Sequence, residues 1–278
     1  MSSELLKLCE PKEYYEQYLL ESVYPNGRSI TEFRGTSIQV GFNPSARGSA
    51  IVQQAGSLVD VSIELNLAVK GEEPKLDFDL DTPETMDEIL LEEAHMILDQ
   101  LNENKAYVSL EAVTANDDRF MWNMKVNIQV LSCDTSFLDA LVAAVSAAFL
   151  DTKIPEIHFA EEIDEDAPLE ISKAIISENT YPLKLTDVPV CSGFAIYKTL
   201  TKQEPELIIL ADPVQELLDF VVSKCIYVVG FEERVHSMLL SGGEPIDINN
   251  IKKLHSLAND RHRTLSVALK NITGRLGD

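Results

Sequence analysis

The sequence YPNGR at residues 24–28, followed by EFR at residues 32–34, is the stretch that decides the fold. Upstream, EPKEYY at residues 10–15 opens a segment whose apolar spacing predicts an amphipathic helix over about residues 11–22. Pro-Asn-Gly favours a tight turn, because proline presets its own φ and glycine accepts a positive φ. The sequence therefore predicts a helix, a tight turn and then a strand over residues 33–42 that carries an arginine near its start.

Apolar periodicity downstream predicts runs of short strands interrupted by a few long helices. The first three strands, which Gly-bearing turns join, are expected to form an antiparallel meander, and the last two a hairpin across Gly230. A helix is predicted to begin with Thr82 as N-cap and Pro83 in the first helical position. Further helices are predicted over residues 136–150 and 247–272, the first of them buried. The predicted strands cover residues 33–42, 49–54, 58–69, 76–81, 106–114, 120–132, 188–200, 206–211, 220–229 and 234–240.

This pattern predicts an α+β fold in which mixed sheets pack against long helices. We expect one domain over residues 1–278, with a short helical extension at about residues 1–24. An acidic connector at about residues 160–170, which contains EEIDED, is predicted to separate two lobes. At 278 residues with 45% hydrophobic content, the chain is long enough to bury a substantial core.

The net charge of −23 and the isoelectric point near 4.5 argue against a protein that binds nucleic acid on its own. Such binding requires Lys and Arg to neutralise phosphates, whereas an acidic surface suits a basic protein partner. No signal peptide is expected at the start, and the longest nearly apolar run, residues 140–150, is too short to cross a membrane. The four cysteines are widely scattered, which predicts reduced thiols rather than a disulfide framework or a zinc knuckle.

No residue pattern predicts a metal site, a cofactor or a catalytic triad. Asp77, Asp79 and Asp81 with Glu88 superficially match a calcium-binding loop. Thr82 stands where that loop needs a glycine, and the apolar residues between the aspartates favour a strand instead. The histidines are expected to be structural, because no set of cysteine, histidine or carboxylate residues completes a metal geometry.

Several short motifs follow one another in an order that is typical of one protein family. They are PNGR at 25–28, EFR at 32–34, GSA at 48–50, LDAL at 138–141, IP at 154–155, VPV at 188–190 and ADP at 211–213. Their order resembles that of the RNase PH-like ring subunits of the eukaryotic RNA exosome. Members typically have Arg-Pro-Asp-Gly-Arg at the turn and Val-Asp-Pro late in the chain, where this sequence has Tyr24, Asn26 and Ala211 in place of Arg, Asp and Val. The resemblance implies an RNase PH-like fold (ribosomal protein S5 domain 2-like) over nearly the whole chain.

Active members of this family cut RNA from its 3′ end with inorganic phosphate, and basic residues hold the RNA and the attacking phosphate. Cations are needed there because two anions must be brought together. Here residues 77–104 contain ten Asp and Glu and no Lys or Arg, and the loop at residues 133–137 has no cation. Asp187 is the candidate match for an acidic position of active members, but one carboxylate without a phosphate pocket makes no catalyst. The sequence therefore predicts no catalytic residue.

The resemblance implies a non-catalytic structural subunit of the exosome core ring, which helps to form the RNA channel for 3′-to-5′ processing and degradation. The implied partners are paralogous RNase PH-like subunits in a hetero-hexameric ring, RNA-binding cap proteins, a hydrolytic nuclease subunit, and RNA in the assembled channel. The implied locations are the nucleus, the nucleolus and the cytoplasm. Two alternatives stay open: an active phosphate-dependent 3′–5′ exoribonuclease subunit, and an acidic adaptor that binds basic protein partners.

Four arginines are candidates to contact RNA phosphates along such a channel. The alternative for each is an ion pair with one of the abundant carboxylates, for example Arg28 with Glu32 or Glu21. The candidates for the RNA path are Arg28, Arg34, Arg47 and Arg119.

Overall fold

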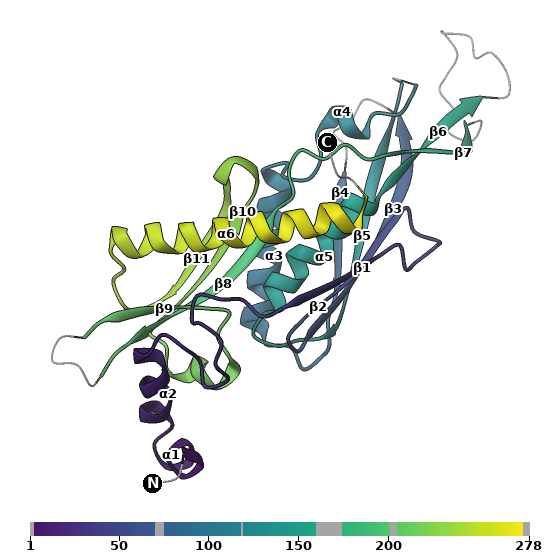
Figure 1. Ribbon diagram of the computed structural model, residues 1–278. Coiled ribbons are helices and arrows are strands. Elements are labelled where there is room, and N and C mark those ends of the chain that lie inside the picture. Colours follow the sequence, from purple (N-terminus) through teal and green to yellow (C-terminus); the bar gives the residue numbers. More distant parts are fainter. Residues whose placement is uncertain (1–2, 70–74, 118, 160–173, 201–204, 275–278) are drawn as a thin grey trace.

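The computed structural model describes residues 3–69, 75–117, 119–159, 174–200 and 205–274. Within these residues the chain forms two larger sheets, a separate two-stranded ribbon, and α-helices that pack between and beside them (Figure 1). None of the helices found there has the length and apolarity that crossing a lipid bilayer requires.

The first sheet has five strands in the order β1-β2-β3-β5-β4. Its first three strands form the predicted antiparallel meander, whereas β4 pairs with β5 in parallel and makes the sheet mixed. Side chains alternate across it: Val59, Val61 and Ile63 are buried on one face, and Asp60 points to the other. The strands are β1 (Thr36–Val40), β2 (Gly48–Gln54), β3 (Ser57–Val69), β4 (Leu76–Asp81) and β5 (Phe120–Ser132).

The second sheet has four antiparallel strands in the order β11-β10-β8-β9. The predicted hairpin across Gly230 is confirmed, because β10 and β11 pair on either side of it. Short 3₁₀ helices, η2 (Gln215–Phe220) and η3 (Phe231–Glu233), lie in the connections. The strands are β8 (Val190–Lys198), β9 (Leu207–Ala211), β10 (Ser223–Val229) and β11 (Val235–Gly242).

Helix α5 (Phe137–Asp151) lies between the two sheets and contacts β2, β3 and β8. Every residue from 137 to 150 is buried, as the apolar, alanine-rich sequence predicts for a helix that is enclosed on all sides. Helix α6 (Ile248–Ile272) packs across β8 and β10 and reaches β1 (Figure 1). Asp247 caps it, because its Oδ1 accepts from the backbone amide of Asn250 at 2.8 Å.

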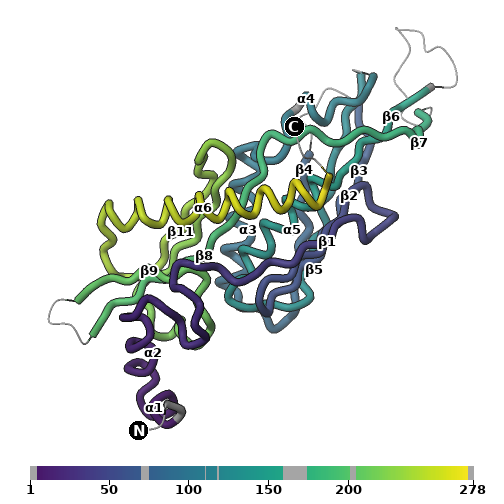
Figure 2. Tube along the Cα trace, viewed as in Figure 1, coloured from purple at the N-terminus to yellow at the C-terminus, as the bar shows by residue number. Residues whose placement is uncertain are grey.

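The two ends of the molecule carry smaller elements (Figure 2). At one end, two helices, α1 (Ser3–Cys9) and α2 (Pro11–Leu20), lie within the range of the helical extension expected at about residues 1–24. Helix α2 packs onto the second sheet, where Tyr15 and Leu19 join a buried cluster with Tyr197. At the other end, the unpredicted strands β6 (Lys153–Phe159) and β7 (Ala174–Pro182) pair as a ribbon. The acidic connector predicted at about residues 160–170 lies outside the described residues.

Two local predictions are wrong. The helix expected from Thr82-Pro83 begins later, as α3 (Glu88–Glu103), because Asp87 accepts from the amide of Ile89 at 3.0 Å and acts as the N-cap. The segment after Pro83 instead forms a turn, in which the carbonyl of Pro83 accepts from Met86 N at 3.0 Å. In place of a strand over residues 106–114, a short helix α4 (Leu110–Val113) forms behind the N-cap Ser109.

Candidate functional site

The Pro-Asn-Gly turn directs Arg28 toward the residues that follow β9. The glycine of the turn has a φ of 86°, and the backbone amide of Tyr24 closes the turn by donating to Arg28 O at 2.8 Å. Nη2 of Arg28 donates to the carbonyl of Asp212 at 2.7 Å. Glu32 accepts from Arg28 through its backbone carbonyl, and the carboxylate that pairs with Arg28 is that of Asp212, at 3.7 Å, rather than the expected Glu32 or Glu21.

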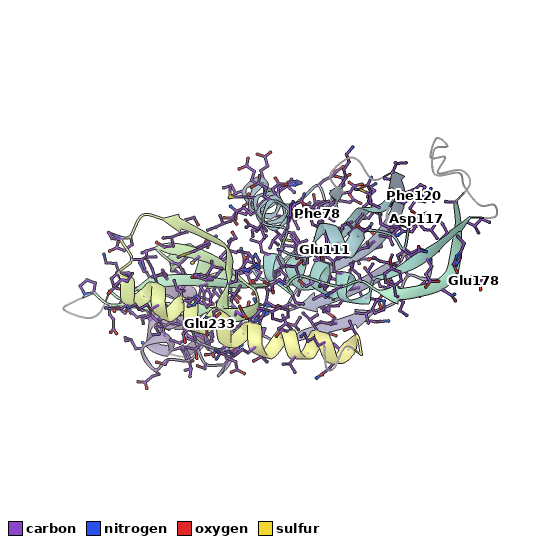
Figure 3. All side chains as sticks on the ribbon, turned by 90° about the horizontal axis from the view of Figure 1, so that it is seen from above. Phe78, Glu111, Asp117, Phe120, Glu178 and Glu233 are labelled. Carbon is purple, nitrogen blue, oxygen red and sulfur yellow. The ribbon has the colours of Figure 1, made fainter. Side chains whose placement is uncertain are left out.

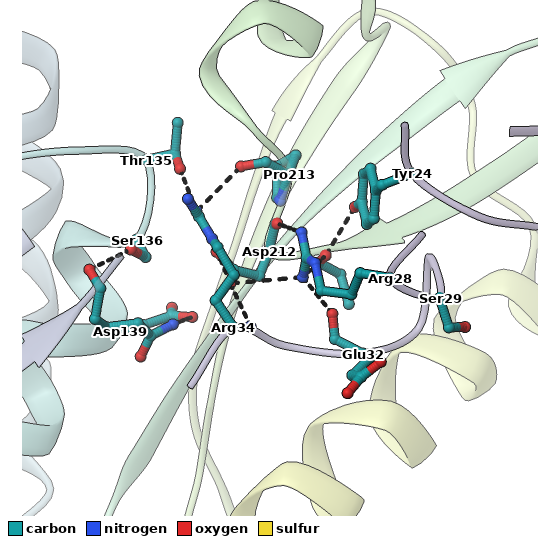
Figure 4. Close-up of polar contacts among 12 residues, drawn as sticks. Tyr24, Arg28, Ser29, Glu32, Arg34, Thr135, Ser136, Asp139, Asp212 and Pro213 are labelled. Atoms are coloured by element: carbon teal, nitrogen blue, oxygen red, sulfur yellow. Dashed lines mark hydrogen bonds and ion pairs between the residues drawn. The ribbon is translucent and has the colours of Figure 1, made fainter. Parts of the chain in front are cut away.

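Arg34 binds the carboxylate of Asp212 through two nitrogen atoms of its guanidinium (Figure 4). Nε donates to Oδ2 at 2.9 Å, Nη2 donates to Oδ1 at 2.6 Å, and the backbone amide of Arg34 adds a third bond at 2.8 Å. Burial alone would raise the pKa of Asp212, which is 1% exposed, but the hydrogen bonds and charge of Arg34 outweigh it and lower that pKa. Arg34 and Asp212 thus form a bidentate ion pair between segments far apart in the chain.

The guanidinium of Arg34 also binds the loop that precedes α5. The family resemblance places the binding of the attacking phosphate at this loop. Nη2 of Arg34 donates to Oγ1 of Thr135 at 2.6 Å, and Nη1 donates to Oδ2 of Asp134 at 3.3 Å. The carboxylate of Asp134 also accepts from the amide of Gly56 at 3.3 Å. The loop therefore presents a carboxylate where a phosphate-binding loop presents cations and free amides.

Asp187 is buried, and both of its carboxylate oxygens have hydrogen-bond partners within the protein. Oδ1 accepts from the amides of Val188 and Phe231, both at 2.7 Å, and Oδ2 lies 2.8 Å from Nε2 of His236. Burial would raise the pKa of Asp187, but these hydrogen bonds outweigh it and hold the pKa below its ordinary value. Gly230 has no room for a side chain, since an added Cβ would lie 1.9 Å from Oδ2 of Asp187. Asp187 thus ties the segment before β8 to the β10–β11 hairpin.

A second buried polar cluster joins α6 to the first sheet, and the sequence analysis did not predict it. Arg261 lies with its guanidinium 4.2 Å from the Phe33 ring centre, and its Nη2 donates to Oε1 of Gln54 at 2.7 Å. Gln54 in turn donates from Nε2 to Asp139 at 3.3 Å, and Arg261 lies 4.0 Å from the same carboxylate. One signal in the sequence was available: Asp139 is the single acid among the buried residues of α5.

Within this cluster, burial strongly shifts the pKa of Asp139. Asp139 is 2% exposed, and burial raises its pKa from 3.8 to about 7, because the charge of Arg261 only partly offsets the loss of water and the nearby Asp212 adds repulsion. The folded protein therefore holds a proton on Asp139 at pH values at which the unfolded chain has released it.

The substitution Asp139→Asn is expected to flatten part of the pH dependence of stability. Because the folded-state pKa is raised, the wild-type free energy of unfolding falls as pH rises from about 4 to about 7, and an uncharged amide side chain removes that loss. Across this pH window the free energy of unfolding of the variant should rise relative to that of the wild type by up to about 4 kcal/mol. At higher pH the difference should stay constant. Urea unfolding at a series of pH values measures the difference. Parallel pH profiles for the two proteins would contradict a titrating Asp139.

The other two arginine candidates lie apart from this region. Arg47 is exposed in the turn between β1 and β2, and its side chain has no ion pair among the described residues. Arg119 pairs with Asp117 at 2.7 Å, and Asp117 lies toward the end of the molecule that carries the β6–β7 ribbon, far from Glu233 (Figure 3). The structure thus brings Arg28 and Arg34 together on Asp212 and separates them from Arg47 and Arg119. Contact of any of the four with RNA stays a prediction.

The structure describes no group of side chains suited to a metal ion, and this statement covers only the residues it describes. Asp77, Asp79 and Asp81 lie on strand β4, as predicted, rather than in a calcium-binding loop. All four cysteines are unpaired. The side chain of His262 contacts the carbonyl of Val188 at 3.1 Å, and its pKa is lowered by burial, which fits a structural role.

Comparison with known proteins identifies relatives that together match most of the chain. The sequence matches the 3′ exoribonuclease family, domain 1, over residues 32–155. The exosome complex component Rrp43 of Schizosaccharomyces pombe is 22% identical over 92% of this chain and 94% of its own length. The exosome complex component Rrp42 of Thermococcus gammatolerans is 29% identical over 61% of this chain and 64% of its own length. The chain thus spans slightly less than two thirds of the length of that archaeal relative.

Solved structures show the same fold. A chain of the Archaeoglobus fulgidus exosome with RNA bound to the active site aligns with a TM-score of 0.68 at 21% identity, over 96% of this chain and 100% of that one. Rrp46 of rice (Oryza sativa) aligns with a TM-score of 0.60 at 15% identity, over 90% of this chain and 99% of that one. These likenesses confirm the predicted α+β, RNase PH-like architecture.

The individual motifs agree with these matches. The likeness to ribosomal RNA-processing protein 43 that the lead-in at residues 10–15 indicates agrees with the match to the fission-yeast Rrp43. The family match begins at the EFR motif and ends at the IP motif, and so contains both the five-stranded sheet and α5. The chain therefore contains the RNase PH-type exoribonuclease domain over residues 32–155 and is similar to subunits of the exosome core along most of its length.

Proposed function

We propose that this chain is a non-catalytic ring subunit of an RNA exosome core. It pairs with paralogous RNase PH-like subunits in a hetero-hexameric ring and helps to form the channel that delivers RNA 3′ ends. RNA-binding cap proteins and a hydrolytic nuclease subunit attach to that ring, which works in the nucleus, the nucleolus and the cytoplasm. The names of the relatives support the ring assignment, since they are exosome components and a subunit of an exosome core.

The observation that carries the non-catalytic part of the proposal is the ion pair of Arg34 with Asp212. Arg34 contacts the loop before α5, yet its guanidinium is already bound by Asp212 and Asp134. A phosphate placed at that loop would face the carboxylate of Asp134, and like charges repel. Asp187, with hydrogen-bonded oxygens and a lowered pKa, has no proton to donate near neutral pH.

The sheet edges support assembly with neighbours. Strands β1 and β4 form the edges of the five-stranded sheet, and an open edge offers unpaired backbone groups to another chain. A closed ring of similar subunits satisfies such edges through repeated interfaces. This role needs no cofactor.

A purified sample of this chain is expected to release no nucleoside diphosphate from RNA and phosphate above the enzyme-free blank. The reason is that, among the residues the structure describes, the loop before α5 offers the attacking phosphate only Arg34, whose guanidinium is already paired. Chromatography of nucleotide products measures the release, with an active archaeal phosphorolytic ring on the same RNA as the positive control. Phosphate-dependent release by this chain alone would overturn the non-catalytic assignment.

The ring assignment has a separate test. Native mass spectrometry of the tagged chain purified from its own cells should show paralogous RNase PH-like subunits in equal amounts. Recovery of the chain alone, or with unrelated basic proteins, would contradict the ring.

A further inference from the structure

The face of the five-stranded sheet that points away from α5 carries a group of acidic side chains. Its outward side chains on β3, β5 and β4 are partly or fully exposed, and we call this surface the outer face. It is defined by Asp60, Ser62 and Glu64 on β3, Lys125, Asn127 and Gln129 on β5, and Asp77, Asp79 and Asp81 on β4. Five of these side chains are carboxylates and one is a lysine, so the outer face is strongly acidic.

Strand register arranges the outer face in three rows that run across the sheet. In each row a β5 residue lies between one residue of β3 and one of β4. Neighbouring strands are about 4.8 Å apart, so the two flanking side chains of a row start about 9.6 Å from each other. The rows are Glu64–Lys125–Asp77, Ser62–Asn127–Asp79 and Asp60–Gln129–Asp81.

The carboxylates of the first two rows interact with Lys125 or Asn127 of β5. Nζ of Lys125 lies 2.9 Å from the carboxylate of Asp79, and Glu64 and Asp77 also raise the pKa of this lysine. Glu64 further accepts from Nδ2 of Asn127 at 3.1 Å. The outer face therefore already holds one cationic side chain between carboxylates of β3 and β4.

The third row has the same carboxylates but no cation. Asp60 and Asp81 have no hydrogen-bond or ion-pair partner among the described residues, and the side chain between them is the neutral Gln129. A hollow of about 230 Å³ opens there, lined by both carboxylates and by Gln129. Asp60 is partly buried, which raises its pKa and disfavours its charge while no counter-ion is present. Leu131, two residues beyond Gln129, is 48% exposed.

We propose that the row Asp60–Gln129–Asp81 binds an arginine side chain from a basic segment of a partner protein. A guanidinium has donors on several sides, so it can lie between two carboxylates that flank an amide oxygen. Its methylene stem would pack on Leu131 while the charge stays with the aspartates. RNA is disfavoured by the sign of the surface, and a metal ion by the spacing, since the described residues bring no three ligands together. This binding does not depend on membership of a ring.

The test uses the full chain and a fluorescent short peptide of alternating arginine and serine, at physiological salt. Fluorescence anisotropy should show saturable binding to the wild type. Asp60→Asn with Asp81→Asn should weaken it about tenfold or more, because both flanking charges are lost. Gln129→Lys should also weaken it, since the new lysine would stand between Asp60 and Asp81 as Lys125 stands between Glu64 and Asp77. The matched control is Glu92→Gln with Asp99→Asn, two exposed acids on α3, which should change affinity less than about twofold.

Each other outcome overturns the proposal. Equal losses in the outer-face and α3 variants would mean general attraction to an acidic protein. Absence of binding to the wild type, or binding that the outer-face variants leave unchanged, would exclude the row as a site. Displacement of the peptide by micromolar calcium that requires Asp60 and Asp81 would assign the row to a metal instead. Circular dichroism verifies that all variants are folded, and failure of the ring proposal would leave these results intact.

Discussion

Replacement of Arg34 by methionine is expected to lower the free energy of unfolding by about 3–5 kcal/mol. The substitution keeps an unbranched stem but removes the guanidinium, and it leaves Asp212, which is 1% exposed, as a buried carboxylate without its bidentate partner. The remaining guanidinium, that of Arg28, lies 3.7 Å away and reaches Asp212 mainly through the backbone carbonyl. Urea unfolding followed by tryptophan fluorescence at pH 7 measures the loss, because Trp122 is buried in the core.

The control for this prediction is Arg119→Met. Arg119 also pairs with an aspartate, at 2.7 Å, but its side chain is 37% exposed, so the loss should stay below about 1 kcal/mol. Adding Asp212→Asn to Arg34→Met should restore part of the stability, because the unpaired charge is gone and asparagine tolerates the positive φ of 46° at this position. Equal effects of Arg34→Met and Arg119→Met would show that burial of Asp212 is not what makes the pair matter.

Replacement of Gly230 by alanine is expected to be about as damaging, at roughly 3–5 kcal/mol. An added Cβ would lie 1.9 Å from Oδ2 of Asp187 and 2.6 Å from Nε2 of His236, so both cannot keep their positions. The methyl group would separate a buried carboxylate from its histidine, and a tightly packed interior has no space to receive either group. The shift of the thermal unfolding midpoint, followed by circular dichroism, measures the effect.

Gly243 offers a matched control for this substitution. A Cβ added there meets no atom within 4 Å, so Gly243→Ala should leave the midpoint nearly unchanged. In the background of Asp187→Ala, which removes the carboxylate, Gly230→Ala should cost much less than in the wild type. An undiminished cost in that background would place the clash with the backbone or with His236 rather than with Asp187.

Much of the fold was visible in local sequence patterns. Alternation of Val59, Val61 and Ile63 predicted β3, and the apolar, alanine-rich run of α5 predicted a buried helix. The failures arose where two local signals competed. Thr82-Pro83 resembles a helix start, but Asp87 lies closer to the apolar helical spacing and supplies the N-cap. The ribbon of β6 and β7 carries no clear alternation, because Ile154, Pro155 and Ile157 of β6 are buried without a regular period and β7 is mostly exposed.

The polar clusters were much harder to predict because their members are remote in sequence. Arg34 and Asp212 are 178 positions apart, and nothing near either residue indicates the other. Arg261 is one of several basic residues on the last helix, and nothing in its local sequence distinguishes it, yet it is buried against Phe33 and Gln54. The motifs marked Asp212 and Asp139 as notable, but only the packing of α5 and α6 against both sheets gives them partners. Pairing across such distances follows from topology rather than from spacing.

The enclosure of α5 between the sheets also constrains how the protein is made. One wall of its compartment, β2 and β3, leaves the ribosome before the helix does, whereas the other wall, β8, is synthesised afterwards. During translation, one apolar side of α5 is therefore exposed to water until β8 has been synthesised and can pack against it. Nascent chains of this protein are natural clients for chaperones during that interval, and slow synthesis after residue 151 would prolong it.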